Sequence, residues 1–228
     1  MKEKWRQRRQ IEPQQGVDLL GKSRANEICR RLTATFSDPR TELSYISDYT
    51  LLVAVVLSAQ TTDVQVNKVT SELFKTCKTP NDILTLGFER LAQQIRSIGL
   101  YRSKARHIIS LSQVLKEKYD SRVPDSREAL ESLSGVGRKS ANVILNTLFK
   151  KPAIAVDTHV FRLGRRLGLS QGSSPLAVEK DLEMIVPENY KSSISNLLVL
   201  HGRYVCKAKN PNCKVCTIVD LCPSCAAD

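Results

Sequence analysis

The sequence contains no apolar run long enough to span a bilayer. Its longest uncharged apolar stretch lies between Asp48 and Asp63, whereas a membrane helix needs about 20 apolar residues. We expect a buried core helix at this position and no association with a membrane. The amino terminus, MKEKWRQRRQ, is basic but is not followed by an apolar segment, which argues against a secretory signal and favours a basic tail.

The sequence also lacks the period-two alternation of half-buried strands, long internal repeats and low-complexity segments. Apolar residues recur instead at helical spacing, as in the stripe of Ala141, Ile144, Leu145 and Leu148. The pattern predicts an all-α fold. The predicted helices include residues 27–36, 50–59, 64–74, 103–119, 126–133, 138–149, 175–186 and 192–202.

Three positions carry the signals of helix starts. Asp125 with Glu128 has capping-box spacing, and Ser174 stands directly before a proline that suits the first helical position. Asp157 precedes a run of apolar positions at helical spacing, so it is expected to be a helix N-cap.

The formal net charge is +12, and the basic residues are clustered rather than spread. Between residues 138 and 166 Asp157 is the only acidic residue, and residues 96–106 contain no acid at all. Clusters of this kind suit a phosphate backbone, because each neutralised phosphate releases counterions. The charge therefore indicates a nucleic-acid partner, although a high isoelectric point alone is weak evidence.

Seven cysteines are present, and four of them follow the pattern Cys206-x6-Cys213-x2-Cys216-x5-Cys222. Without a secretory signal, a metal site is favoured over a disulfide framework. Structural zinc usually takes two close ligand pairs separated by a longer element. Here a single close pair is flanked by two nearby cysteines, which favours a [4Fe–4S] cluster over zinc or unliganded thiols. Cys225 is expected to be a bystander.

The segment LSGVGRK at 133–139 reads as a glycine hairpin that leads into a helix. Gly135 and Gly137 allow positive φ and a bare backbone, so that the N–H groups at the helix start can face a DNA phosphate. An ordinary turn between two helices is the alternative. The basic residues Arg138 and Lys139 favour the phosphate-binding interpretation.

Lys139 and Asp157 are each open to two interpretations. An exposed lysine of ordinary pKa is neutral for only about one part in a thousand near pH 7.4. A nucleophilic amine would need burial or a neighbouring charge, so local chemistry alone favours a phosphate contact for Lys139. Asp157 can be a helix cap, an active-site carboxylate, or both.

Taken together, these segments resemble the endonuclease III branch of the helix-hairpin-helix DNA glycosylases, from about residue 24 to residue 223. The matching stretches are LSAQTTDVQVNK at 57–68, IGLYRSKA at 98–105, LSGVGRKSANVILN at 133–146, AVDTHVFR at 155–162, HGRYVC at 201–206 and the cysteine loop. One departure is Ser134, where the family usually has proline.

The resemblance implies a two-lobed all-α fold with the DNA cleft between the lobes. Its parts would be a flexible basic tail (1–20), an amino-terminal helix packed on the cluster domain (21–40), a six-helix domain with the hairpin (41–151) and a [4Fe–4S] domain (152–228).

Site residues carry over from the family to matching positions. Lys139 matches the nucleophile and Asp157 the essential carboxylate. Gln60 and Leu100 match residues that enter the duplex where the damaged nucleotide leaves it. Gly135, Gly137 and Arg138 would contact DNA.

The implied activity is excision of oxidised or ring-saturated pyrimidines from duplex DNA, followed by cleavage of the strand at the abasic site. We expect a monomer in the bacterial cytoplasm, associated with the nucleoid. Two other hypotheses are an adenine-mismatch glycosylase, which would lack Lys139, and a non-catalytic DNA-binding or electron-transfer protein.

Overall fold

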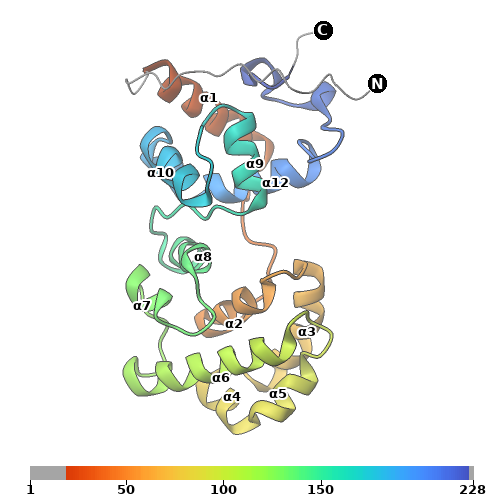
Figure 1. The fold of residues 1–228 in the computed structure, drawn as a ribbon, viewed down its shortest axis with the longest axis vertical. Helices are drawn as coiled ribbons and strands as arrows, with labels where there is room; N and C mark the ends of the chain where they lie inside the picture. The colour runs from red at the N-terminus through yellow and green to blue at the C-terminus, as the bar shows by residue number, and fades with distance from the viewer. Residues whose placement is uncertain (1–18, 226–228) are drawn as a thin grey trace.

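The computed structural model describes residues 19–225, which form helices and connecting loops with no strand. The all-α expectation is confirmed. Two groups of helices lie one above the other in Figure 1, and the chain passes between them after α1 (Leu19–Thr35) and again after α8 (Arg138–Phe149). The predicted basic tail lies outside the described residues up to residue 18, and residues 19 and 20 already belong to α1.

We call the lower group in Figure 1 the hairpin lobe and the upper group the cysteine lobe. The hairpin lobe contains α2 (Asp48–Ser58), α3 (Asp63–Thr76), α4 (Pro80–Leu86), α5 (Phe88–Gln94), α6 (Tyr101–Lys118), α7 (Arg127–Glu131) and α8. The cysteine lobe contains α1, α9 (Thr158–Arg166), α10 (Pro175–Ile185), α11 (Glu188–Lys191), α12 (Ile194–Tyr204) and the short 3₁₀ helices η1 (Cys213–Val215) and η2 (Val219–Leu221).

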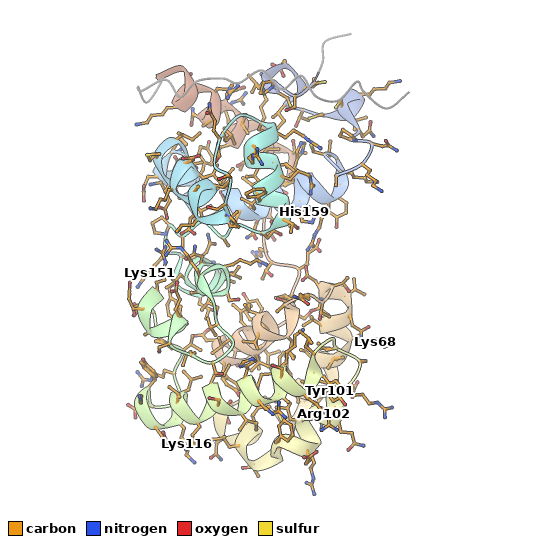
Figure 2. All side chains as sticks on the ribbon, in the orientation of Figure 1. Lys68, Tyr101, Arg102, Lys116, Lys151 and His159 are labelled. Carbon is orange, nitrogen blue, oxygen red and sulfur yellow. The ribbon has the colours of Figure 1, made fainter. Side chains whose placement is uncertain are left out.

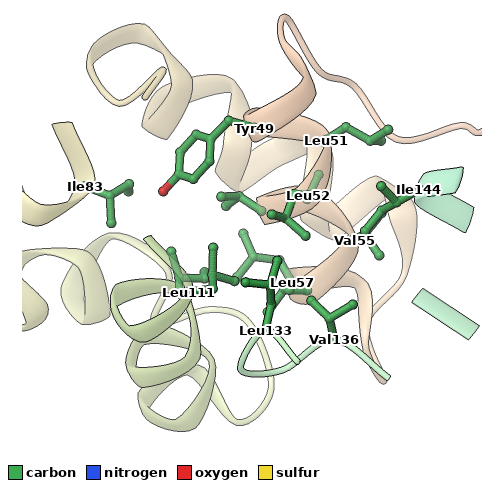
Figure 3. Close-up of a cluster of buried hydrophobic side chains, with 14 of the residues drawn as sticks. Tyr49, Leu51, Leu52, Val55, Leu57, Ile83, Leu111, Leu133, Val136 and Ile144 are labelled. Atoms are coloured by element: carbon green, nitrogen blue, oxygen red, sulfur yellow. The ribbon is translucent and has the colours of Figure 1, made fainter. Parts of the chain in front are cut away.

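Each lobe has its own apolar core. The hairpin lobe is built around α2, whose residues Leu51 to Leu57 are all buried, as expected for the longest apolar stretch. Figure 3 shows this helix packed among side chains of its neighbours, including Leu111 and Ile144. The core of the cysteine lobe joins α1 to the chain after Ile154. No helix in the described part of the chain is long and apolar enough to cross a membrane.

The predicted helices are all present, with ends shifted by a few residues in most cases and α1 starting eight residues before the predicted 27–36. The sequence did not predict α4 and α5, since seven residues are too few to show a clear apolar stripe. Gly87, at φ +77°, separates these two helices. The fully described stretch from Asp48 to Phe149 therefore holds seven helices rather than six.

Two of the three predicted helix caps are confirmed, and one is wrong. Asp157 accepts a hydrogen bond from the Val160 N–H, and Ser174 accepts one from the Ala177 N–H. At α7, however, Ser126 rather than Asp125 is the N-cap. Asp125 instead pairs with Lys151 at 2.9 Å, because the helix starts one residue later than the sequence pattern indicated.

Candidate functional site

A cavity of about 170 Å³ lies between the two lobes, and both predicted catalytic residues line it. Lys139 comes from the first turn of α8, and Asp157 stands directly before α9. Ser58 and Ala59, at the end of α2, and Asn196 and Arg203 of α12 also line it. The fold thus brings together two residues that are 18 positions apart in sequence.

Lys139 is exposed, and no hydrogen bond or ion pair joins its ammonium group to another residue within 19–225. Its side chain lines the cavity while α8 holds its backbone. The amine is therefore available to a molecule in the cavity.

Asp157 fulfils its capping role with one carboxylate oxygen. Its Oδ1 accepts from the Val160 N–H at 2.8 Å, and the half-buried side chain also lines the cavity. A carboxylate has a second oxygen with lone pairs of its own. The cap and an active-site role are therefore compatible.

Sequence reasoning missed an ionic cluster at the cavity wall. Arg203 forms ion pairs with Glu42 and, at 2.7 Å, with Asp63. Tyr204 donates a hydrogen bond to Glu42 at 3.0 Å. These contacts join α12 of the cysteine lobe to the hairpin lobe beside the cavity. Arg203 stands inside the quoted HGRYVC stretch, but its acidic partners lie about 140 to 160 residues away, so local sequence could not identify them.

The glycine hairpin has a left-handed backbone at Gly135 but not at Gly137, where φ is −97°. Gly135 has φ +82°, and an added Cβ would lie 2.8 Å from the Cβ of His107, so no larger residue fits there. Gly137 is the N-cap of α8 and gives it no side-chain cap. Ser134, where the family usually has proline, binds Nδ1 of His107 through its hydroxyl at 2.8 Å. The hairpin is thus tied to α6, and the start of α8 remains open to a ligand.

Arg138 contributes to the structure through its side chain. Its guanidinium forms a bidentate ion pair with Glu179 of α10, which is 4% exposed, at distances from 2.9 to 3.1 Å. This ion pair raises the pKa of Arg138 above its ordinary value. Asn142 also donates to Glu179, at 3.1 Å. The pair fixes α8 against the cysteine lobe one residue before Lys139.

Gln60 and Leu100 occupy two neighbouring turns of the hairpin lobe. Both have left-handed backbone, with φ of 54° and 58°, and both side chains are exposed, Leu100 by 65%. Non-glycine residues adopt this conformation only where the surroundings impose it. Figure 2 shows Tyr101 and Arg102, which directly follow Leu100, at the end of α6 nearest α3.

All four predicted ligand cysteines line a second cavity, of about 160 Å³, at the far end of the cysteine lobe. Cys225, Arg166 and His201 also line it. The Arg166 guanidinium donates to the sulfur of Cys206 at 3.3 Å, and Nε2 of His201 lies 3.6 Å from the sulfur of Cys216. A charged donor such as the Arg166 guanidinium stabilises a thiolate at Cys206.

The arrangement of these sulfurs bears on the kind of metal site. Within residues 19–225, no group of three or more His, Cys, Asp and Glu side chains is placed to hold a single ion. A zinc ion would draw four ligands around one point, with zinc–sulfur distances of about 2.3 Å. In a [4Fe–4S] cluster each thiolate binds a different iron, so the sulfurs surround a larger body. The cavity is lined by the four predicted ligands and by Cys225, so it brings together the four thiols that a [4Fe–4S] cluster needs.

Comparisons with known proteins show which family the chain is similar to. Residues 53–188 match the HhH-GPD superfamily of base excision DNA repair proteins. The endonuclease III of Escherichia coli (strain K12) is 47% identical over 203 residues, which cover 89% of this chain and 96% of that protein. The endonuclease III of Rickettsia felis is 49% identical over 197 residues, covering 86% and 92%. The solved structure of a trapped endonuclease III–DNA covalent intermediate has a TM-score of 0.84 at 45% identity, covering 89% of this chain and 96% of that one.

Proposed function

The chain belongs to the HhH-GPD superfamily of base excision DNA repair proteins, and on this premise we propose that it is a bifunctional DNA glycosylase and abasic-site lyase. It removes oxidised or ring-saturated pyrimidines from duplex DNA and then cleaves the strand 3′ to the abasic site. The observation that carries this proposal is the cavity that Lys139 and Asp157 line together. A relative trapped as a covalent complex with DNA supports it.

In the proposed mechanism, the neutral amine of Lys139 attacks C1′ of the damaged nucleotide. The bond from nitrogen to C1′ forms as the bond from C1′ to the base breaks, and that electron pair leaves with the base, which takes up a proton. Opening of the sugar ring then gives a protonated Schiff base. This cation acidifies the C2′ proton, whose removal expels the 3′ phosphate by β-elimination.

Asp157 assists by accepting the proton that Lys139 must lose or by stabilising the positive charge that develops on the sugar. Because Oδ1 is held by the Val160 N–H, Oδ2 is the oxygen available for this role. The cap fixes the direction of the carboxylate, which keeps the reacting oxygen at the cavity.

The glycine hairpin binds the DNA backbone without reading sequence. Open N–H groups at the start of α8 face a phosphate, and the helix dipole favours the negative charge there. Gly135 and Gly137 allow this close approach, and Arg138 contributes its backbone N–H while its guanidinium holds Glu179. Gln60 and Leu100 fill the gap that the extruded nucleotide leaves, which offsets part of the unstacking energy.

We further propose that Cys206, Cys213, Cys216 and Cys222 hold a [4Fe–4S] cluster, which fastens the loop they belong to. The exposed residues Lys207, Lys209 and Lys214 then form a basic surface on that loop. The cluster domain would comprise residues 21–40 and 152–228, and the domain with the glycine hairpin, expected from the resemblance to have six helices, would comprise residues 41–151. The two separate cores support this division.

Both proposed reacting groups line one cavity of a single chain, so the enzyme is proposed to act as a monomer on double-stranded DNA that contains damaged bases or abasic sites. Since the curated relatives named above are bacterial endonuclease III proteins, we place its action on the bacterial chromosome in the cytoplasm.

Borohydride trapping tests the nucleophile. The unaltered chain should form a covalent adduct with duplex DNA that carries thymine glycol, because borohydride reduces the Schiff base. Lys139→Gln should form none. The matched control is Lys180→Gln, which removes the same charge at an exposed position on α10 and should trap like the unaltered chain. An equal adduct yield from Lys139→Gln would refute the assignment.

The same duplex separates the other hypotheses. A protein that only binds DNA gives neither base release nor strand cleavage. An adenine-mismatch glycosylase releases adenine rather than thymine glycol. Scoring base release and nicking separately on single-lesion duplexes therefore also ranks the lesions.

A further inference from the structure

A buried lysine lies beneath the two turns that carry Gln60 and Leu100. Lys104 of α6 is 4% exposed, and no ion pair within residues 19–225 neutralises it. Its ammonium donates to the Leu57 carbonyl at 2.8 Å, the Ala59 carbonyl at 2.5 Å and the Thr61 hydroxyl at 2.9 Å. The three N–H groups of the ammonium thus donate to three uncharged acceptors, so the hydrogen-bonding capacity of the ammonium is fully used.

These acceptors surround Gln60 on both sides. Leu57 lies in the last turn of α2, where carbonyls lack helical partners, and a cation at a helix carboxyl end is favoured by the helix dipole. Ala59 and Thr61 are the residues directly before and after Gln60. Lys104 therefore holds both flanks of a residue whose left-handed backbone needs external support.

Lys104 is joined to the second turn as well. Leu100 is the N-cap of α6, and the Lys104 N–H makes the ordinary helical hydrogen bond to its carbonyl at 3.0 Å, so the backbone of Lys104 belongs to the turn that follows Leu100. Beside this contact, a Cβ built on Gly99 would lie 4.0 Å from the Gln60 carbonyl, so the two turns are neighbours. The Lys104 side chain thus ties the first turn of α6, which follows Leu100, to the turn that carries Gln60.

Burial is unfavourable for an ammonium group, and it lowers the pKa of Lys104. If the position served packing alone, an apolar side chain would fill it without that cost.

We propose that Lys104 is a positioning residue that locks the Gln60 and Leu100 turns into one rigid unit for entry into the duplex. This inference rests on the proposed function. It predicts a defect confined to double-stranded DNA, because a single strand has no opposite base and no gap to fill. The chemistry of Lys139 should remain intact.

The test compares Lys104→Met with Lys118→Met, the same substitution at an exposed position in the last turn of α6. Base release from a thymine-glycol duplex is measured together with borohydride trapping on a single-stranded oligonucleotide that carries an abasic site. Misplacing a group by about 1 Å can cost about 100-fold in rate. We therefore expect Lys104→Met to lose about 100-fold on the duplex and less than about twofold on the single strand. Lys118→Met should lose neither activity.

A second variant covers the case in which Lys104→Met folds poorly. Thr61→Val removes one of the three acceptors while leaving the lysine in place, and one lost hydrogen bond should slow duplex base release by about fivefold. Its single-strand trapping should be unchanged.

Equal losses on the two DNA forms, or no loss on the duplex in either variant, would overturn the inference. If the unaltered chain traps neither DNA, the proposed function fails and the inference fails with it. If the unaltered chain is trapped but the variants lose equally on duplex and single-stranded DNA, the role of Lys104 is rejected and the proposed function stands.

Discussion

The hairpin lobe and the cysteine lobe are stabilised by different means. The hairpin lobe draws its core from one continuous stretch of chain, residues 43–153. The cysteine lobe joins α1 to the chain after Ile154, and beyond Cys206 its loop buries only Ile218 among residues 207–225. Apolar burial can maintain the first lobe. The loop of the second lobe buries too little apolar surface to hold its shape without the proposed cluster.

Loss of a cluster ligand should affect the cysteine lobe and leave the hairpin lobe unchanged. Cys213→Ser should abolish iron binding, because the cluster loses one of its four thiolates. Amide exchange in residues 206–222 should then become fast, while α2 and α6 keep their protection. Iron content and hydrogen exchange by mass spectrometry measure both effects.

Cys225→Ser is the matched control for that experiment, since the residue lines the same cavity without belonging to the predicted ligand set. It should retain its iron. Loss of iron from Cys225→Ser with retention in Cys222→Ser would move the fourth ligand by three residues.

One leucine-to-alanine substitution in the core of each lobe tests whether the two lobes are independent. Leu111 and Leu197 are both fully buried, one in each lobe. Replacing either by alanine should lower the free energy of unfolding by about 2–5 kcal/mol. Only Leu197→Ala should also speed the loss of iron to a chelator, because α12 leads directly into the cysteine loop. Equal rates of iron loss would show that the lobes are not independent in this respect.

The smallest expected effect concerns the link between the lobes. Glu179→Gln removes the negative charge of the carboxylate that accepts hydrogen bonds from Arg138 and Asn142. Hydrogen bonds to charged groups contribute about 1.5–3 kcal/mol, and the Arg138 side chain is 41% exposed, so solvent screening lowers the expected loss to about 1–2 kcal/mol. Thermal unfolding measures it. Glu89→Gln, at an exposed position of α5, should stay within about 0.5 kcal/mol. A similar value for both variants would show that the Arg138–Glu179 ion pair does not stabilise the contact between the lobes.

The helices and caps that were predicted correctly are those in which the local sequence pattern matches the environment that the side chains have in the fold. The 138–149 stripe predicted α8 to the residue, and Asp157 and Ser174 cap the helices they precede. The start of α7 was misplaced by one residue, because Asp125 and Ser126 are both good caps and the local pattern does not choose between them.

The burial of Lys104 could have been inferred from its position on the apolar stripe of α6, but it was not predicted. It precedes Ile108, Leu111 and Leu115 by four, seven and eleven residues, so it lies on the buried stripe of its helix. Its charge placed it in a basic cluster of the sequence, and burial was not predicted because a lysine is rarely buried. Its acceptors are more than 40 residues away along the chain.

The helical fold, the cysteine loop and the glycine hairpin could be predicted from the sequence, since each depends on residues that lie close together along the chain. Which of these segments share a cavity depends on the packing of helices that are far apart in the sequence. Lys139 and Asp157 line one cavity, Arg138 is engaged with Glu179, and Arg203 joins two acids of the other lobe. A charged side chain has several possible partners in a basic chain, and packing between distant helices selects one of them.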